Sequence, residues 1–197
     1  MRVLFLGNSY TFYNNMPELF KDICARNCVD AEVMSVTCGG YTIAHFVSND
    51  NDCGRRAKEL LNQYKFDYVV LQEMSVRPAS NPETFLKSVR EFMPYIRENG
   101  ARPALYQTWG RPDGSPLLVE KGWTHEEMQE LLKSAYVKAA KEHDAIFVPA
   151  GDRLHEAYRE GRDTYSDDGG HPSPEGSAII AQAFFDALVT KQMEGSK

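Results

Sequence analysis

The chain has 197 residues and a formal net charge of -6 at pH 7. This length fits one domain, expected over residues 1–197, which would bury roughly 70% of its unfolded surface without help from metals or disulfides. The acidic balance argues against a nucleic-acid partner, because phosphate binding needs clustered Lys and Arg side chains. No apolar run approaches the ~20 residues of a membrane-spanning helix, so no membrane span is expected.

All four cysteines fall in the first third of the chain: Cys24, Cys28, Cys38 and Cys53. They form no Cys-x-x-Cys pair, and a structural zinc site normally takes four ligands, so neither a metal nor a cofactor is expected. We expect free thiols and therefore a cytoplasmic protein. A secreted or periplasmic location stays open if a leader sequence has been removed.

The first apolar run, residues 3–6, predicts a strand that is buried on both faces. Gly7-Asn8-Ser9 ends this strand, so a serine lies at its carboxyl end, where ligands bind in open α/β sheets. Asn8 and Ser9 are also common turn formers, and position alone does not make Ser9 catalytic. Helical spacing follows from Met16, and further strands are predicted at 31–36 and 67–71, with a short helix between them.

The second half repeats this alternation of helix and strand. Asn81-Pro82 begins a helix that stops at Asn99-Gly100, Thr124 and Glu127 form a capping box, and Ser173-Pro174 begins a last helix. Apolar runs predict strands at 103–107 and 145–149. Five strands separated by helices imply right-handed βαβ units, and therefore a three-layer α/β/α sandwich around a five-stranded parallel sheet.

A second motif, Asp168-Gly-Gly-His171, places a carboxylate three residues before an imidazole. A turn of this length can bring the carboxylate to the Nδ1 hydrogen and leave Nε2 facing outward. Acidic residues and histidines also meet by chance in polar loops, so the spacing alone is weak. The other histidines lie in or beside helical patterns and are expected to be ordinary surface or boundary residues: His45, His125, His143 and His155.

Together, Gly7-Asn8-Ser9, Gly40 after the second strand and Asp168-x-x-His171-Pro172 resemble the SGNH/GDSL hydrolase superfamily in order and spacing. The resemblance spans essentially the whole chain and implies a flavodoxin-like topology. It also implies a catalytic triad, with Ser9 as the nucleophile, His171 as the general base and Asp168 as the group that orients the imidazole. The chain departs from the usual Gly-Asp-Ser and Gly-x-Asn-Asp blocks, the second being replaced by residues 71–75, Leu-Gln-Glu-Met-Ser.

The resemblance further implies an oxyanion hole built from the backbone N–H groups of Ser9 and Gly40. The Gln72 amide would replace the family's asparagine as the third donor, although a polar residue can also simply end a strand. Gln107 and Asn8 are the next candidates for that donor. Tyr10, Tyr41 and Trp109 are expected to wall the substrate pocket, with Tyr106 and Tyr165 as further aromatic candidates.

The expected function is that of a serine ester hydrolase acting on a carbohydrate ester or another small ester. The sequence has no long apolar lid segment, which favours short acyl groups such as acetyl. A lipid or thioester acylhydrolase would use the same catalytic residues and stays open. A non-catalytic binding module that keeps the fold is the alternative from another class, supported by the missing Gly-x-Asn-Asp block.

Overall fold

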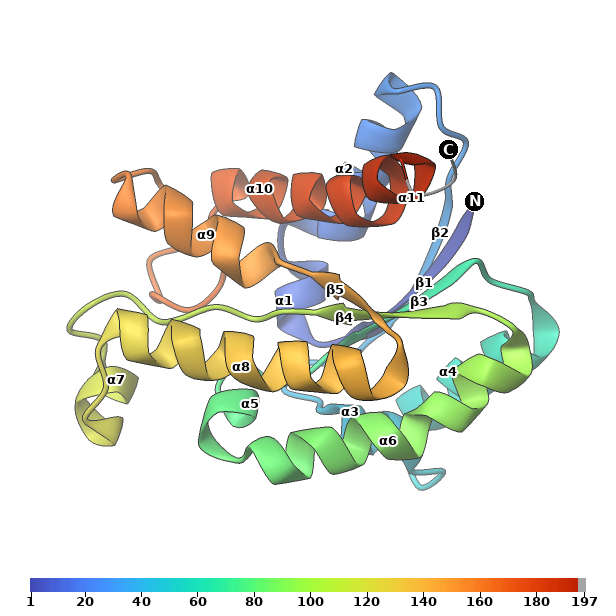
Figure 1. Cartoon of the computed structure of the whole chain (residues 1–197), viewed down its shortest axis with the longest axis horizontal. Coiled ribbons are helices and arrows are strands. Elements are labelled where there is room, and N and C mark those ends of the chain that lie inside the picture. The colour runs from blue at the N-terminus through green and yellow to red at the C-terminus, as the bar shows by residue number, and fades with distance from the viewer. Residues whose placement is uncertain (195–197) are drawn as a thin grey trace.

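Five parallel strands form the sheet of this protein, as seen in a computed structural model that describes residues 1–194 (Figure 1). The strand order is β2-β1-β3-β4-β5, the flavodoxin-like order that was predicted. Each predicted strand end differs from the observed end by one residue. The strands are β1 (Arg2–Gly7), β2 (Glu32–Thr37), β3 (Tyr68–Gln72), β4 (Arg102–Tyr106) and β5 (Ile146–Val148).

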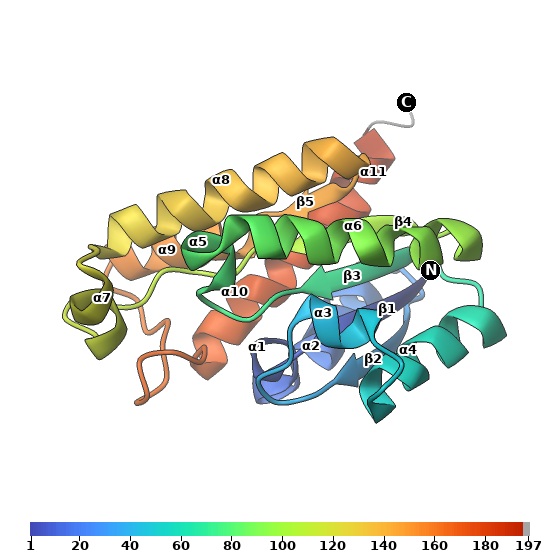
Figure 2. The ribbon, with the colours of Figure 1, turned by 90° about the horizontal axis from the view of Figure 1, so that it is seen from below.

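Helices cover both faces of the sheet and complete the predicted three layers (Figures 1 and 2). The longer helices are α2 (Met16–Arg26), α4 (Asp52–Gln63), α6 (Pro82–Asn99), α8 (His125–His143), α9 (Ala150–Arg159) and α10 (Pro174–Phe185). Two further segments close the described chain, the π-helix η2 (Asp186–Thr190) and α11 (Lys191–Glu194). Within residues 1–194, none of the helices has both the length and the apolar character needed to cross a bilayer.

The side chains of β1 alternate between two apolar cores, one on each face of the sheet. Val3 and Phe5 pack with residues of α2, α9 and α10, whereas Leu4 and Leu6 pack with residues of α4, α6 and α8. All four are fully buried. A strand covered on both faces needs an uninterrupted apolar run, which is why residues 3–6 stand out in the sequence.

Four short helices lie in segments for which the sequence predicted neither a helix nor a strand. They are α1 (Ser9–Phe12), α3 (Ile43–Val47), α5 (Arg77–Ser80) and α7 (Pro116–Lys121), and a 3-10 turn, η1 (Tyr13–Asn15), follows α1. Helices of four to six residues are too short to show a clear 3.6-residue period, so the sequence pattern did not reveal them. Two of these helices, α1 and α3, are the first helices after β1 and β2 in the chain and help to shape the site at the carboxyl edge of the sheet.

Cys38 and Cys53 form a disulfide, which corrects the prediction that all four cysteines are free. The bond joins the segment after β2 to α4. Cys24, which is buried, and Cys28, which is exposed, are free thiols as predicted. Cysteine spacing does not determine connectivity, because only the packing of β2 against α4 brings these two side chains together.

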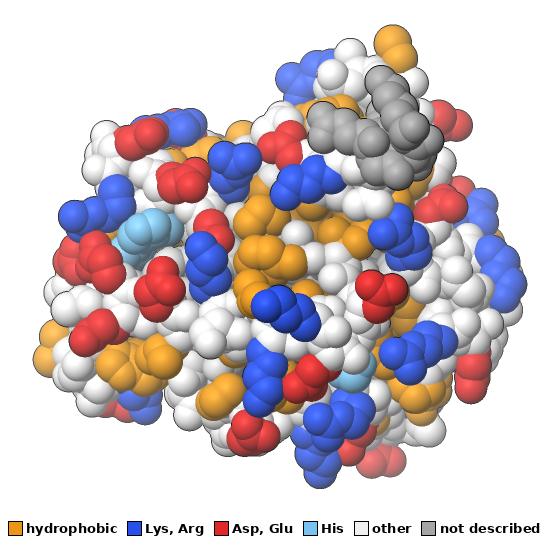
Figure 3. Space-filling model, viewed as in Figure 1, with side chains coloured by type: hydrophobic (Ala, Val, Ile, Leu, Met, Phe, Trp, Pro, Cys, Tyr) orange, Lys and Arg blue, Asp and Glu red, His pale blue; other side chains and the backbone are white. Residues whose placement is uncertain are grey.

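Acidic and basic side chains are interspersed on the face of the molecule drawn in Figure 3. Most of the ion pairs join exposed partners, for example Arg159 with Glu126 at 2.9 Å and Arg162 with Glu175 at 2.7 Å. Surface pairs of this kind contribute little to folding stability, about 0 to 1 kcal/mol each. The fold therefore depends chiefly on the two apolar cores.

Candidate active site

Ser9 begins α1 directly after β1, at the carboxyl edge of the sheet. Gly7 allows this sharp turn, because a Cβ there would collide with the side chains of Thr11 and Gln72. Asn8 caps the helix: its Oδ1 accepts from the N–H of Tyr10 at 3.1 Å. The turn thus presents Ser9, which is partly exposed, from a buried strand and a capped helix.

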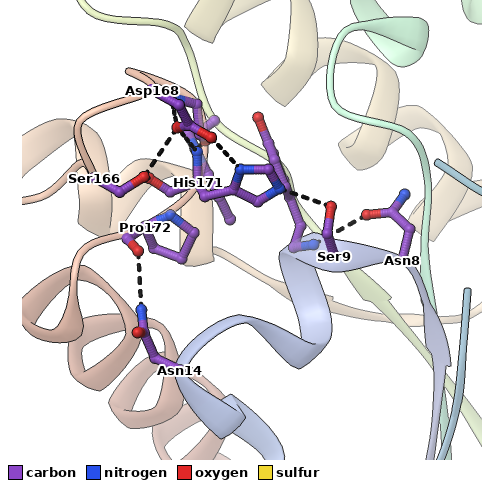
Figure 4. Close-up of polar contacts among 10 residues, drawn as sticks. Asn8, Ser9, Asn14, Ser166, Asp168, His171 and Pro172 are labelled. Carbon is purple, nitrogen blue, oxygen red and sulfur yellow. Dashed lines mark hydrogen bonds and ion pairs between the residues drawn. The ribbon is translucent and has the colours of Figure 1, made fainter. Parts of the chain in front are cut away.

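His171 lies against Ser9 although 162 residues separate them in the chain (Figure 4). The distance from His171 Nε2 to Ser9 Oγ is 2.8 Å, and the distance from His171 Nδ1 to Asp168 Oδ2 is 2.5 Å. With Nδ1 protonated, Nε2 can take the Ser9 proton. The structure therefore brings the three predicted residues into one hydrogen-bonded chain.

Asp168 is held by more than the imidazole. Its Oδ1 accepts from the Ser166 hydroxyl at 2.9 Å and from the N–H groups of Gly170 at 2.7 Å and His171 at 2.9 Å. Partial burial acts in the opposite direction, but the hydrogen bonds, led by those from His171, hold the pKa of Asp168 well below its usual range. The carboxylate stays ionised and can stabilise a charged imidazole.

The segment after α1 also holds the imidazole, a feature that the sequence did not indicate. The ring of Tyr13 stacks on His171, with centroids 4.3 Å apart. The Asn14 amide donates to the carbonyl of Pro172 at 2.9 Å (Figure 4) and to Ser177 Oγ at 2.9 Å. Asn14 has φ = 50°, a left-handed conformation that asparagine tolerates better than most residues.

Gly40 lies in the turn after β2 with φ = 71°, which favours glycine. The Asn8 amide donates to the carbonyl of Tyr41 at 2.7 Å, so it ties this turn to the Ser9 segment. Within residues 1–194, the backbone N–H groups of Ser9 and Gly40 have no acceptor. Both are free to bind an oxyanion.

Comparison with solved structures identifies the family. A protein from Slackia heliotrinireducens assigned to the SGNH hydrolases is 31% identical and superposes with a TM-score of 0.85, and the match covers 95% of this chain and 98% of that one. The chain belongs to the SGNH hydrolases. No protein-family model matches the sequence, and neither does any curated protein.

More distant structures share the SGNH hydrolase fold. TesA is 18% identical with a TM-score of 0.71, and the match covers 96% of this chain and 99% of that one. The acetyl xylan esterase AlAXEase is 14% identical with a TM-score of 0.70, with 96% of this chain and 100% of that one covered. At these identities the likeness concerns the fold alone.

The structure places the Gln72 amide differently from the predicted oxyanion donor. Gln72 is fully buried, its Oε1 accepts from Asn8 N–H at 2.8 Å and from Thr11 Oγ1 at 2.9 Å, and its Nε2 donates to the carbonyl of Glu73. The two other candidates are also engaged, because the Asn8 amide donates to Tyr41 and the Gln107 amide to Asp152 at 2.8 Å. Gln72 thus holds the turn that presents Ser9.

Replacing Gln72 with alanine should therefore destabilise this SGNH hydrolase. Two buried donors would lose their acceptor, with an expected loss of about 2 to 4 kcal/mol in the free energy of unfolding. Urea denaturation measures the loss, with the exposed Gln63→Ala as the matched control. An unchanged stability combined with a kcat lower by about 10²-fold would instead support the predicted oxyanion role.

Glu73 is a buried carboxylate beside the site that sequence reasoning passed over. Its Oε1 accepts from Met74 N–H at 2.7 Å, and its Oε2 accepts from the N–H of Ile43, the first residue of α3, at 3.3 Å. Burial raises the pKa of Glu73 to about 7, against the opposing effect of those hydrogen bonds and of Arg77. Glu73 therefore connects the end of β3 to the helix that follows the Gly40 turn.

The raised pKa of Glu73 predicts a pH-dependent stability. Between pH 4.5, the ordinary pKa of a glutamate, and about pH 7, Glu73 keeps its proton in the folded protein and loses it in the unfolded chain. The contribution of Glu73 to folding stability is therefore complete below pH 4.5 and is lost as the pH rises through 7. The glutamine of Glu73→Gln does not titrate, so the variant lacks this pH dependence. Relative to the wild type, the variant should gain on the order of 3 kcal/mol of stability from about pH 4 to about pH 8.

Thermal and urea unfolding across that pH range test the Glu73 prediction. The control is Glu98→Gln, which changes an exposed glutamate in the same way. Glutamine has one side-chain oxygen in place of two, so it cannot replace the hydrogen bonds to both Met74 and Ile43. The stability lost with that hydrogen bond does not vary with pH. A constant stability difference between wild type and Glu73→Gln at every pH would contradict the assignment.

Two of the aromatic residues expected to wall the pocket lie beneath the site. Trp109 is fully buried and Tyr10 is 3% exposed, and their rings stack with centroids 4.2 Å apart. Trp109 Nε1 donates to the carbonyl of Gly170 at 3.0 Å, so this ring supports the loop that carries His171. Tyr41 is partly exposed and stacks on His45, with centroids 4.4 Å apart.

The remaining aromatic residues and histidines named in the sequence also include both buried and partly exposed side chains. Tyr106 is fully buried, whereas Tyr165 is partly exposed and donates to the carbonyl of Gly110 at 2.7 Å. His125 is also fully buried, which corrects the expectation of a surface or boundary residue. Its Nε2 lies 2.8 Å from Nδ1 of His155.

Proposed function

We propose that this SGNH hydrolase is a serine esterase that removes short acyl groups, such as acetyl, from a carbohydrate or another small alcohol. Hydrolysis of ester bonds follows from its family. The observation that carries the proposal is the continuous hydrogen-bonded chain from Ser9 Oγ through the His171 imidazole to the Asp168 carboxylate. A binding module that had lost catalysis would have no need to keep these three groups aligned.

In the proposed reaction, Ser9 Oγ attacks the ester carbonyl while its proton passes to His171 Nε2. The negative charge that forms on the carbonyl oxygen is bound by the free N–H groups of Ser9 and Gly40. The C–O bond then breaks, and His171 gives its proton to the departing alcohol. Water, activated by His171, hydrolyses the acyl-serine and restores the hydroxyl of Ser9.

The limited apolar surface near Ser9 supports a short acyl group. Within residues 1–194, the large exposed apolar side chains are Phe12, Val119 and Leu131, and of these Phe12 alone belongs to the Ser9 segment. A long acyl chain needs a continuous apolar surface to leave water. AlAXEase, one of the structural neighbours, is an acetyl xylan esterase, which supports a carbohydrate acetate as one substrate class.

Initial rates with p-nitrophenyl acetate and p-nitrophenyl octanoate test the proposal. We expect kcat/KM to be higher for the acetate, and we expect a serine-directed phosphonate to label one residue, Ser9. Higher activity on the octanoate would favour a lipid or thioester acylhydrolase. Absence of both turnover and labelling would favour the binding module.

A further inference from the structure

Arg111 lies beside the proposed catalytic residues, in the loop between β4 and α7. Its guanidinium packs against Gly170, where an added Cβ would collide with Nη1 and Cζ. Its Cζ lies 5.8 Å from the centre of the Tyr10 ring. Gly170 precedes His171 and Tyr10 follows Ser9, so this cation flanks both segments of the site.

The guanidinium of Arg111 has no anionic partner in the part of the chain that the structure describes. Within residues 1–194 it makes neither an ion pair nor a hydrogen bond, and its Nε is buried without an acceptor. Two carboxylates of the neighbouring loops have other partners, because Asp168 binds His171 and Asp113 Oδ2 lies 4.0 Å from Arg159 Nη1, and a third, Asp167, is exposed and forms no ion pair with Arg111. A buried charged donor without an acceptor is costly, which indicates that the missing partner is an anion from a ligand.

The loop that carries Arg111 is fixed on both sides of this residue. Gly110 N–H donates to Gln129 Oε1 at 3.0 Å, and the carbonyl of Arg111 lies 2.8 Å from His125 Nδ1. Trp109 is tied to Gly170 through its indole N–H. The backbone at Arg111 is therefore preorganised. Binding of an anion there would order little further backbone, so it would lose little conformational entropy.

The positions of the surrounding groups indicate which part of an ester would meet Arg111. Asn8, whose amide ties down the Gly40 turn, lies on the opposite side of Ser9 from His171 (Figure 4). The carbonyl oxygen would face the Gly40 side, whereas the departing alcohol must approach His171 to receive its proton. Because Arg111 packs against Gly170, it lies on the side of the alcohol.

We propose that Arg111 is a subsite for a carboxylate carried by the alcohol part of the ester. This inference rests on the proposed esterase function and narrows its substrate class to acylated acidic alcohols, such as acetylated sugar acids. A planar guanidinium matches the two oxygens of a carboxylate and forms charge-assisted hydrogen bonds with it. The subsite would determine substrate preference without taking part in bond breaking.

A matched pair of esters tests the subsite: phenyl acetate and 3-acetoxybenzoate, which differ by one carboxylate on the departing alcohol. Arg111→Gln should lower kcat/KM for 3-acetoxybenzoate by about tenfold or more and change that for phenyl acetate by no more than about threefold. Arg111→Lys, which keeps the charge without the planar fork, should retain part of the preference. Arg97→Gln, an exposed arginine on α6, is the control for net charge and should leave both rates unchanged.

Hydrolysis is measured by pH-stat titration of the acetic acid that is released. The carboxylate also changes the intrinsic reactivity of the ester, but this effect is the same for every variant and cancels when variants are compared. Equal losses on both esters would overturn the subsite and assign Arg111 to support of the His171 loop. No loss on either ester would overturn it as well. If the wild type hydrolyses neither ester and no phosphonate labels Ser9, the esterase proposal fails and the subsite falls with it.

Discussion

Replacing Ser9 with alanine should lower kcat by about 10⁴-fold or more, because no acyl-enzyme can form without its hydroxyl. The side chain is partly exposed, and among the residues that the structure describes its hydroxyl bonds to His171 Nε2 alone, so the fold should be unaffected. The measurement is kcat with p-nitrophenyl acetate, alongside circular dichroism of the same samples. Ser35→Ala, which removes an exposed hydroxyl from β2, is the matched control.

Chemical labelling gives the Ser9 prediction a second readout. A phosphonate should modify the wild type once and the Ser9→Ala variant not at all. Modification of another residue, or turnover by Ser9→Ala near the wild-type level, would show that the nucleophile lies elsewhere. The two measurements are independent, since labelling requires an activated hydroxyl but no product release.

The second large effect is expected at Asp168. In Asp168→Asn, the remaining side-chain oxygen is needed by Ser166, Gly170 and His171 N–H, which leaves the new NH₂ group facing Nδ1. His171 would then carry its proton on Nε2 and could not accept one from Ser9. We expect kcat to fall roughly 10²- to 10⁴-fold, less than for Ser9→Ala, because the aspartate orients and stabilises the imidazole.

Asp167 supplies the control, since it neighbours Asp168 and has the same side chain. Asp167 is exposed and makes no hydrogen bond within residues 1–194. Asp167→Asn should keep nearly full kcat while changing the net charge by the same amount. Equal losses in the two variants would mean that the loss comes from the charge of the loop and not from the bond to His171.

The sheet was predictable because its determinants are local. A strand buried on both faces needs a continuous apolar run, and each of the five strands was found within one residue of its ends. Helix boundaries followed from caps: Thr124 and Glu127 form the expected capping box, and Ser173 Oγ accepts from Gly176 N–H at 2.9 Å. The short helices α1, α3, α5 and α7 contain too few residues to show a helical period, and they were not predicted.

The candidate triad was also visible in the sequence, because the motifs around Ser9 and Asp168-x-x-His171 are short and ordered along the chain. The partners of individual polar groups were not visible. Gln72 ends β3, as predicted, but its Oε1 accepts hydrogen bonds from Asn8 and Thr11. The carboxylate of Glu73 accepts a hydrogen bond from the N–H of Ile43. Such pairs join segments that are far apart in the chain, so no spacing rule reveals them.

The sequence by itself determined the fold class and the candidate catalytic residues, because apolar runs, caps and short motifs consist of residues that are close together in the chain. The strand order was implied by the resemblance to the SGNH/GDSL superfamily. Only the tertiary structure decided which side chains line the site and which support it. Trp109 lies beneath the site, Tyr13 lies on the imidazole and Arg111 lies beside Gly170. Burial and pairing depend on how distant segments pack, and an aromatic or charged residue looks the same in a sequence whether it faces a substrate or the core.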